Sequence, residues 1–269
     1  MQSSTSTGAI DFTHRRAALV VAHPGHELRV YSWALAACPQ VFILTDGSGH
    51  SGKSRLDSTT RVLEQIGAKA GHIYGRLTDR KIYSAIMGQE LNLFVDLAEE
   101  LAEALLREQI DYVVGDALEG YNPAHDICRL IINAAVEIAS CTRGQSIPNF
   151  DILLAGKPSD YPEACFENAI WLYLEEDVFA RKLECLRAYS ELAGEVERII
   201  KQEGMQAIRS ECLRPVTTRM YESFTEERPY YEIYGERQVA AGVYEKVLRH
   251  QKHFRPLAHA LHQYVKNRD

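Results

Sequence analysis

Short, wholly apolar runs alternate with amphipathic stretches along the first half of the chain. The apolar runs are rich in Val, Ile and Leu, which is typical of strands that are buried on both faces of a sheet. Strands of this kind are predicted at 17–22, 41–45, 72–75 and 111–115. Apolar residues recur at helical spacing between these runs, which predicts helices at 28–37, 56–66, 91–108 and 127–138. Strands that alternate with helices in this way indicate a parallel sheet.

The second half of the chain is less regular. Two further strands are predicted at 151–154 and 169–174, and two helical stretches at 177–202 and 236–266. The segment 214–234 holds two prolines and four tyrosines and is predicted to be a loop with one short strand, while Pro256 is predicted to kink the last helix. The pattern predicts an α/β fold, a Rossmann-like parallel sheet with helices on both faces and a helical C-terminal region. We expect a frayed N-terminus, 1–16, and one domain over 17–269.

Polar clusters follow the predicted strands at the point where each strand ends. Because parallel strands end at one edge of the sheet, we expect the clusters to share one rim. A single cluster is easily explained by packing, but four on one rim indicate a functional site. The clusters are His23 with His26, Asp46, Thr78 with Asp79, and Asp116 with Glu119 and His125. The spacing of His23 and His26 in a turn lets both imidazoles reach one metal ion.

Composition narrows the class of protein. The 269 residues carry a formal net charge of −7, which argues against nucleic-acid binding because nucleic-acid binders usually present a basic face. The six cysteines form no C-x-x-C pair, so we expect reduced thiols and a cytoplasmic protein. The first residues do not resemble a signal peptide, and no apolar stretch approaches the roughly eighteen residues that span a bilayer. The oligomeric state is left open, with a homo-oligomer as one alternative.

The ordered set of motifs resembles the PIG-L family of metal-dependent de-N-acetylases, the LmbE-like proteins. Its A-H-P-D-D-E motif corresponds to Ala22-His-Pro-Gly-His-Glu27, its T-D-G motif to Thr45-Asp46-Gly47 and its H-P-D-H motif to Asn122-Pro-Ala-His125. Arg55 precedes Gly67 by the interval of the family's R-x-x-E-L…L-G helix, although Ser58 stands where Glu is usual, and Leu77-Thr78-Asp79 matches the family's short strand and Asp. The resemblance covers roughly residues 17–200 and implies a divalent metal, zinc first.

The chain departs from the family inside the first and last motifs. By position, the resemblance implies that His23, His26 and His125 bind the metal, with His26 in place of a carboxylate. Gly25 stands where the family has the aspartate that acts as general base, and it can accept no proton. Asn122 stands where a His steadies the oxyanion, and a side-chain amide can still donate that hydrogen bond.

An enzyme with this site needs a replacement base, because losing a general base costs about 10²–10⁴-fold in rate. Carboxylates in the right loops belong to Glu27, Asp46, Glu119 and Asp126, and Glu119 is slightly favoured because its loop contains a flexible Gly. Asp126 is alternatively a partner that orients His125.

The substrate is expected to meet polar side chains of the same loops. These are Asp46, Arg55, Asp79 and Tyr121. A sugar needs directional hydrogen bonds to its hydroxyls, and an Arg fork also suits phosphate or carboxylate. The first hypothesis is therefore a metal-dependent hydrolase that removes an acyl group, such as acetyl, from an N-acylated amino-sugar, glycoconjugate or related small molecule. The alternatives are a protein of the same fold with another reaction, and a non-catalytic sugar-binding relative.

Overall fold

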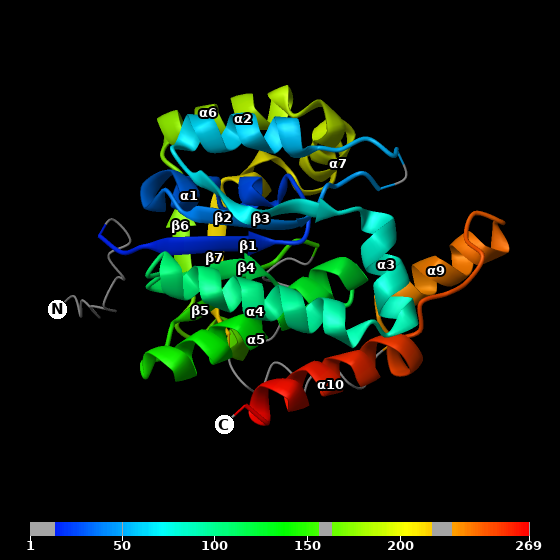
Figure 1. Ribbon diagram of the computed structural model, residues 1–269. Helices are drawn as coiled ribbons and strands as arrows, with labels where there is room; N and C mark the ends of the chain where they lie inside the picture. The colour runs from blue at the N-terminus through cyan, green and yellow to red at the C-terminus, as the bar shows by residue number, and fades with distance from the viewer. Residues whose placement is uncertain (1–13, 50, 156–162, 217–227, 269) are drawn as a thin grey trace.

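The computed structural model describes residues 14–49, 51–155, 163–216 and 228–268 (Figure 1). Within these ranges a seven-stranded sheet has the order β3-β2-β1-β4-β5-β7-β6. Its strands are β1 (Ala17–Val21), β2 (Gln40–Thr45), β3 (Lys69–Leu77), β4 (Tyr112–Asp116), β5 (Asn149–Ile152), β6 (Ile170–Tyr173) and β7 (Ser210–Pro215). The first five strands are parallel, as predicted, and β7 runs antiparallel to both of its neighbours. The predicted α/β fold is confirmed, but the sheet is mixed because β7 is antiparallel at the edge that ends in β6.

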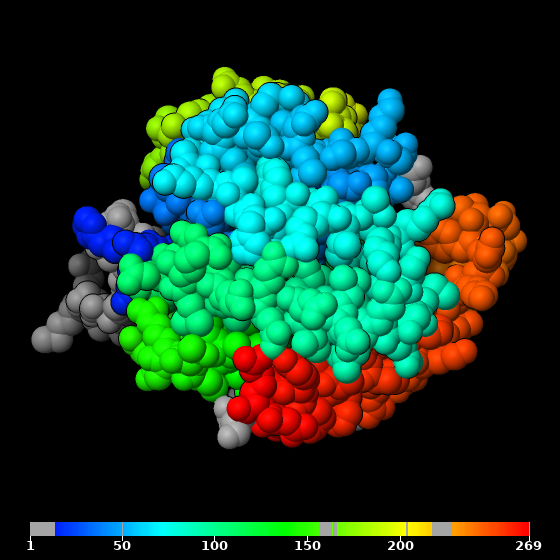
Figure 2. Space-filling model, viewed as in Figure 1, coloured from blue at the N-terminus to red at the C-terminus, as the bar shows by residue number. Residues whose placement is uncertain are grey.

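Helices cover both faces of the sheet (Figure 1). On one face lie α1 (Tyr31–Ala37), α2 (Leu56–Ile66), α6 (Glu176–Ala188) and α7 (Ala193–Glu203), and on the other α4 (Leu91–Arg107), α5 (Pro123–Arg143) and α10 (Arg255–Lys266). Near the carboxyl ends of the parallel strands lie α3 (Asp79–Gly88) and α9 (Tyr230–Ala240). Short helical turns are η1 (His26–Val30), η3 (Glu163–Phe166), η4 (Ser190–Leu192), η5 (Met205–Ile208) and η7 (His250–Phe254). On the face seen in Figure 2, α10 packs along α4 and α5.

The strand β1 is buried along its whole length, which explains its unbroken apolar sequence. Ala18 and Val20 belong to the core beneath α4 and α5, whereas Leu19 and Val21 belong to the core beneath α1 and α2. Successive side chains of a strand point to opposite faces, so a central strand covered on both sides has no polar position.

Several predicted elements differ from the structure in the second half of the chain. The predicted helix 177–202 is divided into α6 and α7 by η4, because the backbone leaves the helical region at Tyr189. The short strand expected in 214–234 is β7, which starts earlier, and that segment also contains the start of α9, while 217–227 lies outside the described residues. Pro256 lies in the first turn of α10, where a missing N–H costs little, and it starts that helix instead of kinking it.

The order of the strands creates a switch point between β1 and β4. From β1 the chain winds outward through β2 and β3, and it then returns to place β4 on the other side of β1. Ligands of open α/β sheets bind outside the carboxyl ends of strands at such a point. In the described part of the chain, no helix is long and apolar enough to cross a membrane. The frayed N-terminus, most of which lies outside the described residues, and the single domain stay predictions.

Candidate functional site

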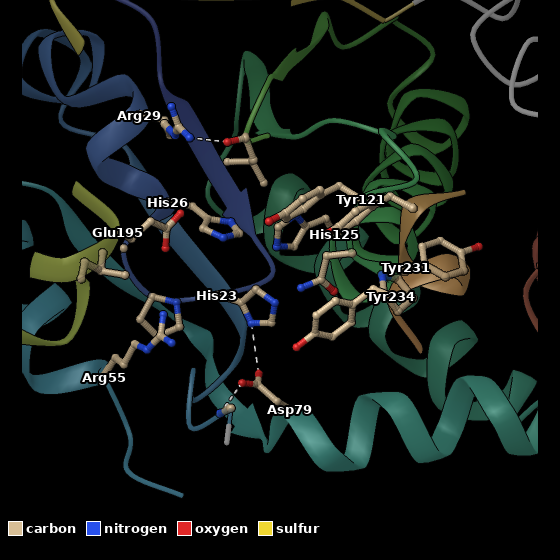
Figure 3. A pocket seen from close by; sticks show the side chains of 18 of the residues that line it. His23, His26, Arg29, Arg55, Asp79, Tyr121, His125, Glu195, Tyr231 and Tyr234 are labelled. Carbon is tan, nitrogen blue, oxygen red and sulfur yellow. Dashed lines mark hydrogen bonds and ion pairs between the residues drawn. The ribbon is translucent and has the colours of Figure 1, made fainter. Parts of the chain in front are cut away.

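Three imidazoles meet at the switch point of the sheet. His23 and His26 follow β1, and His125 lies in the first turn of α5, which follows β4. The ring centroids are 5.3 Å apart for His23 and His26, 5.1 Å for His23 and His125, and 4.7 Å for His26 and His125. Figure 3 shows the three rings facing one cavity. The expectation that loops after different strands share one rim is therefore confirmed for these residues.

Carboxylates hold the outer nitrogens of two of these rings. His26 Nδ1 lies 3.0 Å from Asp116 Oδ1, and the other oxygen of this buried carboxylate accepts a hydrogen bond from the Ala22 N–H at 2.7 Å. His23 Nδ1 lies 2.8 Å from Thr45 Oγ1 and 3.0 Å from Asp79 Oδ1, an ion-pair distance without good hydrogen-bond geometry. Occupied Nδ1 atoms leave Nε2 of both rings for a ligand, the arrangement usual for metal-binding His.

Asp79 is held as a carboxylate by its surroundings. Burial raises the pKa of Asp79, but the neighbouring His23 and Thr45 side chains and the hydrogen bond from the Gly49 N–H at 2.6 Å outweigh burial, so that the pKa is lowered overall. Asp79, expected to bind substrate, thus also supports His23.

His125 differs from the other two histidines because it has no supporting carboxylate. Its Nδ1 is buried and makes no hydrogen bond within the described residues. Burial, together with the neighbouring His26 and His23, lowers the pKa of His125 well below its ordinary value, so the ring is neutral. We expected Asp126 to orient it, but Asp126 Oδ1 instead accepts hydrogen bonds from the backbone N–H groups of Glu119 and Gly120. A neutral imidazole with an unpaired buried nitrogen is available as a metal ligand.

The spacing of the rings fits a shared zinc ion, although the donor atoms do not form a finished site. Around a tetrahedral zinc with Zn–N distances of about 2.0–2.1 Å, ring centroids lie roughly 5 Å apart. The three observed separations surround this value. Among the residues that the structure describes, however, no group of three or more His, Cys, Asp or Glu is arranged to hold a metal ion. The donor chemistry and the ring spacing fit zinc, although the donor atoms are not arranged around a common point.

The histidines open into a cavity of about 1090 Å³. Arg55, Asp79, Tyr121 and Asn122, which the sequence singled out, line it too (Figure 3). Asn122 begins α5 as its N-cap, because Asn122 Oδ1 accepts a hydrogen bond from the Ala124 N–H at 2.8 Å. The same oxygen accepts a hydrogen bond from the Tyr83 hydroxyl, which leaves the Asn122 NH₂ group without an acceptor in the described part of the chain.

Several solved structures resemble this fold. The conserved protein TT1542 from Thermus thermophilus matches with a TM-score of 0.51 and 15% identity, over 76% of this chain and 95% of that one. A deacetylase of the teicoplanin biosynthesis pathway, in complex with bog, has a TM-score of 0.49 and 14% identity, over 75% and 98% of the two chains. The zinc-inhibited form of teicoplanin deacetylase Orf2 has a TM-score of 0.48 and 13% identity, over 75% of this chain and 98% of that one. No family model and no curated protein matches the chain.

The chain has an LmbE-like fold. This confirms the fold that the motifs implied. At identities of 13–15%, the likeness to these solved structures shows the fold alone.

Within this LmbE-like fold, the expected carboxylates near the histidines turn away from the cavity. Glu27 is fully buried and accepts hydrogen bonds from the Gly25 N–H at 2.7 Å and the Thr59 hydroxyl at 2.8 Å, and burial raises its pKa. Glu119 accepts a hydrogen bond from the Leu154 N–H at 2.8 Å, and Asp46 accepts one from the Ser48 N–H at 3.0 Å. The cavity lining includes none of these three carboxylates.

At position 25, two features of the structure disfavour any side chain. Gly25 has a φ of +104°, which L side chains rarely adopt. An ideal Cβ built on Gly25 would lie 2.5 Å from Leu192 Cδ1, so the leucine would have to move. The space that a side chain at position 25 would need is therefore occupied by Leu192.

Sequence reasoning missed the part of the lining that comes from α7 and α9. Glu195, Tyr230 and Tyr234 line the cavity together with the histidines. The cluster of tyrosines around α9 was the only local signal, and it did not indicate where the helix would lie.

Proposed function

We propose that this chain is a metal-dependent hydrolase of the PIG-L type that removes an acyl group from an N-acylated amino-sugar or a related small molecule. The observation that carries the proposal is the contact of His23, His26 and His125 at the switch point, with carboxylates at Nδ1 of the first two. Three imidazoles and an open fourth position suit a catalytic zinc or a similar divalent ion.

The side chains around the cavity supply the remaining parts of an amide hydrolysis. A bound divalent ion would polarise the acyl carbonyl and make water more acidic. The free NH₂ group of Asn122 donates a hydrogen bond to the oxygen that becomes negative in the transition state. Arg55 has no carboxylate partner within the described residues and offers a planar fork to hydroxyl, phosphate or carboxylate groups of the substrate. Asp116 and Asp79 keep His26 and His23 in position.

The packing of Leu192 against Gly25 favours a second candidate function. Without a base at this position, the same cavity serves a protein that binds an N-acylated sugar and does not hydrolyse it. Both candidates use the cavity, but only the first requires the metal and product formation.

Zinc titration of the purified chain tests the proposal. We expect one equivalent of zinc to bind the wild type, weaker binding by His125→Ala, and unchanged binding by His259→Ala, which replaces an exposed histidine of α10. Acetate release from a panel of N-acetylated amino-sugars then separates the candidates. Zinc binding with acetate release supports the hydrolase, whereas sugar binding without acetate release supports the second candidate. No zinc uptake by the wild type contradicts the hydrolase.

A further inference from the structure

Four tyrosine rings form a row along one wall of the cavity. Tyr121 stacks on Tyr230, with ring planes 3° apart and centroids 5.1 Å apart. Tyr230 lies 6.2 Å from Tyr234, and Tyr234 lies 6.4 Å from Tyr244, measured between centroids. All four residues line the cavity that contains the histidines. Tyr121 directly precedes Asn122, so the row starts beside the proposed reaction centre (Figure 3).

The row is held in place by the backbone and by a buried tyrosine of α9. The Tyr231 N–H donates to the Gly120 carbonyl at 3.3 Å, which attaches α9 to the loop leading into His125. The Tyr231 side chain is buried, and its hydroxyl lies 2.7 Å from His250 Nδ1. Figure 3 shows the Tyr231 ring directed away from the cavity. Tyr231 therefore fixes the helix, while its neighbours face the ligand.

The two stacked rings have faces available to a ligand. Tyr121 is 43% exposed and Tyr230 is 44% exposed, although both line a concave site. Aromatic rings gain from stacking in addition to the area that they bury. The cavity volume of about 1090 Å³ exceeds the ~300–1,000 Å³ of usual small-molecule pockets, which is more room than one sugar ring fills.

We propose that the tyrosine row binds a planar aromatic group of the ligand. The substrate class is then an N-acylated amino-sugar attached to an aromatic aglycone. This inference rests on the proposed function for the sugar and acyl groups, but the aromatic site stands on the tyrosines themselves.

Calorimetric binding of three N-acetylglucosaminides tests the aromatic site. The para-nitrophenyl glycoside should bind about twofold to tenfold more tightly than the cyclohexyl glycoside, and the methyl glycoside should bind most weakly. Tyr230→Ala should remove the advantage of the aryl group, and Tyr230→Leu, which keeps apolar bulk, should remove it as well. Tyr173→Ala, at a 75% exposed tyrosine of β6, should keep it. Equal affinity for the aryl and cyclohexyl glycosides would overturn the proposal.

An aromatic dye without a sugar separates this proposal from the proposed function. Anilinonaphthalene sulfonate should bind the wild type and Tyr173→Ala, and its fluorescence should fall in Tyr230→Ala and Tyr230→Leu. If no glycoside binds but the dye behaves in this way, the sugar function fails and the aromatic site stands. If the dye gives the same signal with all four proteins, the aromatic site fails.

A different observation, the packing of Leu192 against Gly25, bears on the missing base. Leu192 directly precedes α7, and Glu195 follows three residues later, so the two side chains lie on the same side of the helix start. Glu195 lines the cavity together with His26, and Figure 3 shows its carboxylate on the His26 side of the cavity. In contrast to Glu27 and Glu119, it makes no hydrogen bond or ion pair within the described residues.

We infer that Glu195 is the catalytic base of the proposed hydrolase. Its carboxylate takes a proton from the attacking water as the new C–O bond forms, and it gives that proton to the amine as the C–N bond breaks, which yields the free acid and the amine. The element that leaves no room for a side chain at position 25 thus brings a carboxylate to the same cavity. This inference rests on the proposed function.

Glu195→Gln tests this role against Glu197→Gln, a change at an exposed residue of the same helix. We expect acetate release to fall about 10²–10⁴-fold in the first variant alone, with zinc affinity unchanged in both. With cobalt(II) in place of zinc, the pH midpoint of the visible spectrum should move to lower pH in Glu195→Gln alone, because a nearby negative charge is lost. Weaker zinc binding by Glu195→Gln would make Glu195 a ligand and overturn the inference.

The cobalt measurement remains decisive if the wild type releases no acetate. If the pH midpoint of the cobalt spectrum still shifts in Glu195→Gln, Glu195 lies at the metal centre, and it is the proposed reaction that is incorrect. An unshifted midpoint, or no binding of cobalt, would reject Glu195 as the base.

Discussion

Asp116 Oδ1 lies 3.0 Å from His26 Nδ1, and solvent does not reach this carboxylate. Asp116 ends β4, whereas His26 follows β1, so the contact joins the two strands between which the order of the sheet reverses. The second oxygen of Asp116 binds the Ala22 N–H, which fixes the backbone just before His23. One buried carboxylate therefore sets the position of both histidines after β1.

Asp116→Asn should weaken zinc binding about 10-fold to 100-fold without unfolding the protein. The amide oxygen can still accept from the Ala22 N–H, but the amide NH₂ then faces His26 Nδ1 and favours the tautomer that carries its proton on Nε2. Zinc titration of the variant measures the change. Asp57→Asn, at an exposed residue of α2, is the control. Equal zinc affinity of wild type and Asp116→Asn would show that the carboxylate does not set the tautomer.

Gly25→Ala should lower the free energy of unfolding by about 1–3 kcal/mol. Part of the cost is the positive φ, and part is the displacement of Leu192. Urea unfolding of Gly25→Ala, Leu192→Ala and the double variant separates the two parts. The glycine substitution should cost less when Leu192 is already truncated, because only the backbone strain remains. Additive effects of the two substitutions would argue against contact between these positions.

The sequence was sufficient to find the histidines because local patterns determine where they lie. A buried strand has an unmistakable apolar run, and parallel strands end at one edge, so His23, His26 and His125 could be placed on one rim without coordinates. The same rule could not determine where each side chain points. Glu27 and Glu119 belong to the correct loops, but both accept backbone hydrogen bonds away from the cavity.

The rest of the cavity could not be predicted because it depends on packing between distant elements. Glu195 faces the cavity because α7 starts beside Gly25, and Tyr230 faces it because α9 is attached to Gly120. Neither contact has a signal in local hydrophobic periodicity. The α3 helix was missed for a simpler reason. Its N-cap is Thr78, whose side chain accepts a hydrogen bond from the Lys81 N–H, but from the sequence Thr78 was interpreted only as part of a site loop.

Lys182 and Glu211 form a buried ion pair whose loss should be costly. Lys182 Nζ lies 2.9 Å from Glu211 Oε1, and the Glu211 carboxylate also accepts from the Ser32 and Trp33 N–H groups. Lys182→Ala should lower the free energy of unfolding by about 3–5 kcal/mol, because it leaves a buried carboxylate without its cation. Lys81→Ala, which breaks an exposed pair with Glu90, should cost less than about 1 kcal/mol. Urea unfolding compares the two variants, and similar costs would contradict this account.

The ion pairs that hold α9 should give the stability of the protein a dependence on acid pH. Glu236 is paired with Arg228 and Arg249, which lower its pKa from 4.5 to about 2. Because the folded pKa lies below the unfolded one, the contribution is complete above pH 4.5 and is lost as the pH falls toward 2.

The difference in unfolding free energy between the wild type and Glu236→Gln should therefore be constant above pH 4.5 and shrink below it. High salt should reduce this difference, because the pairs are exposed to solvent. Glu137→Gln, at an exposed residue of α5, is the control. A difference between wild type and Glu236→Gln that persists unchanged down to about pH 2 would show that Glu236 is not held as a carboxylate by the two arginines.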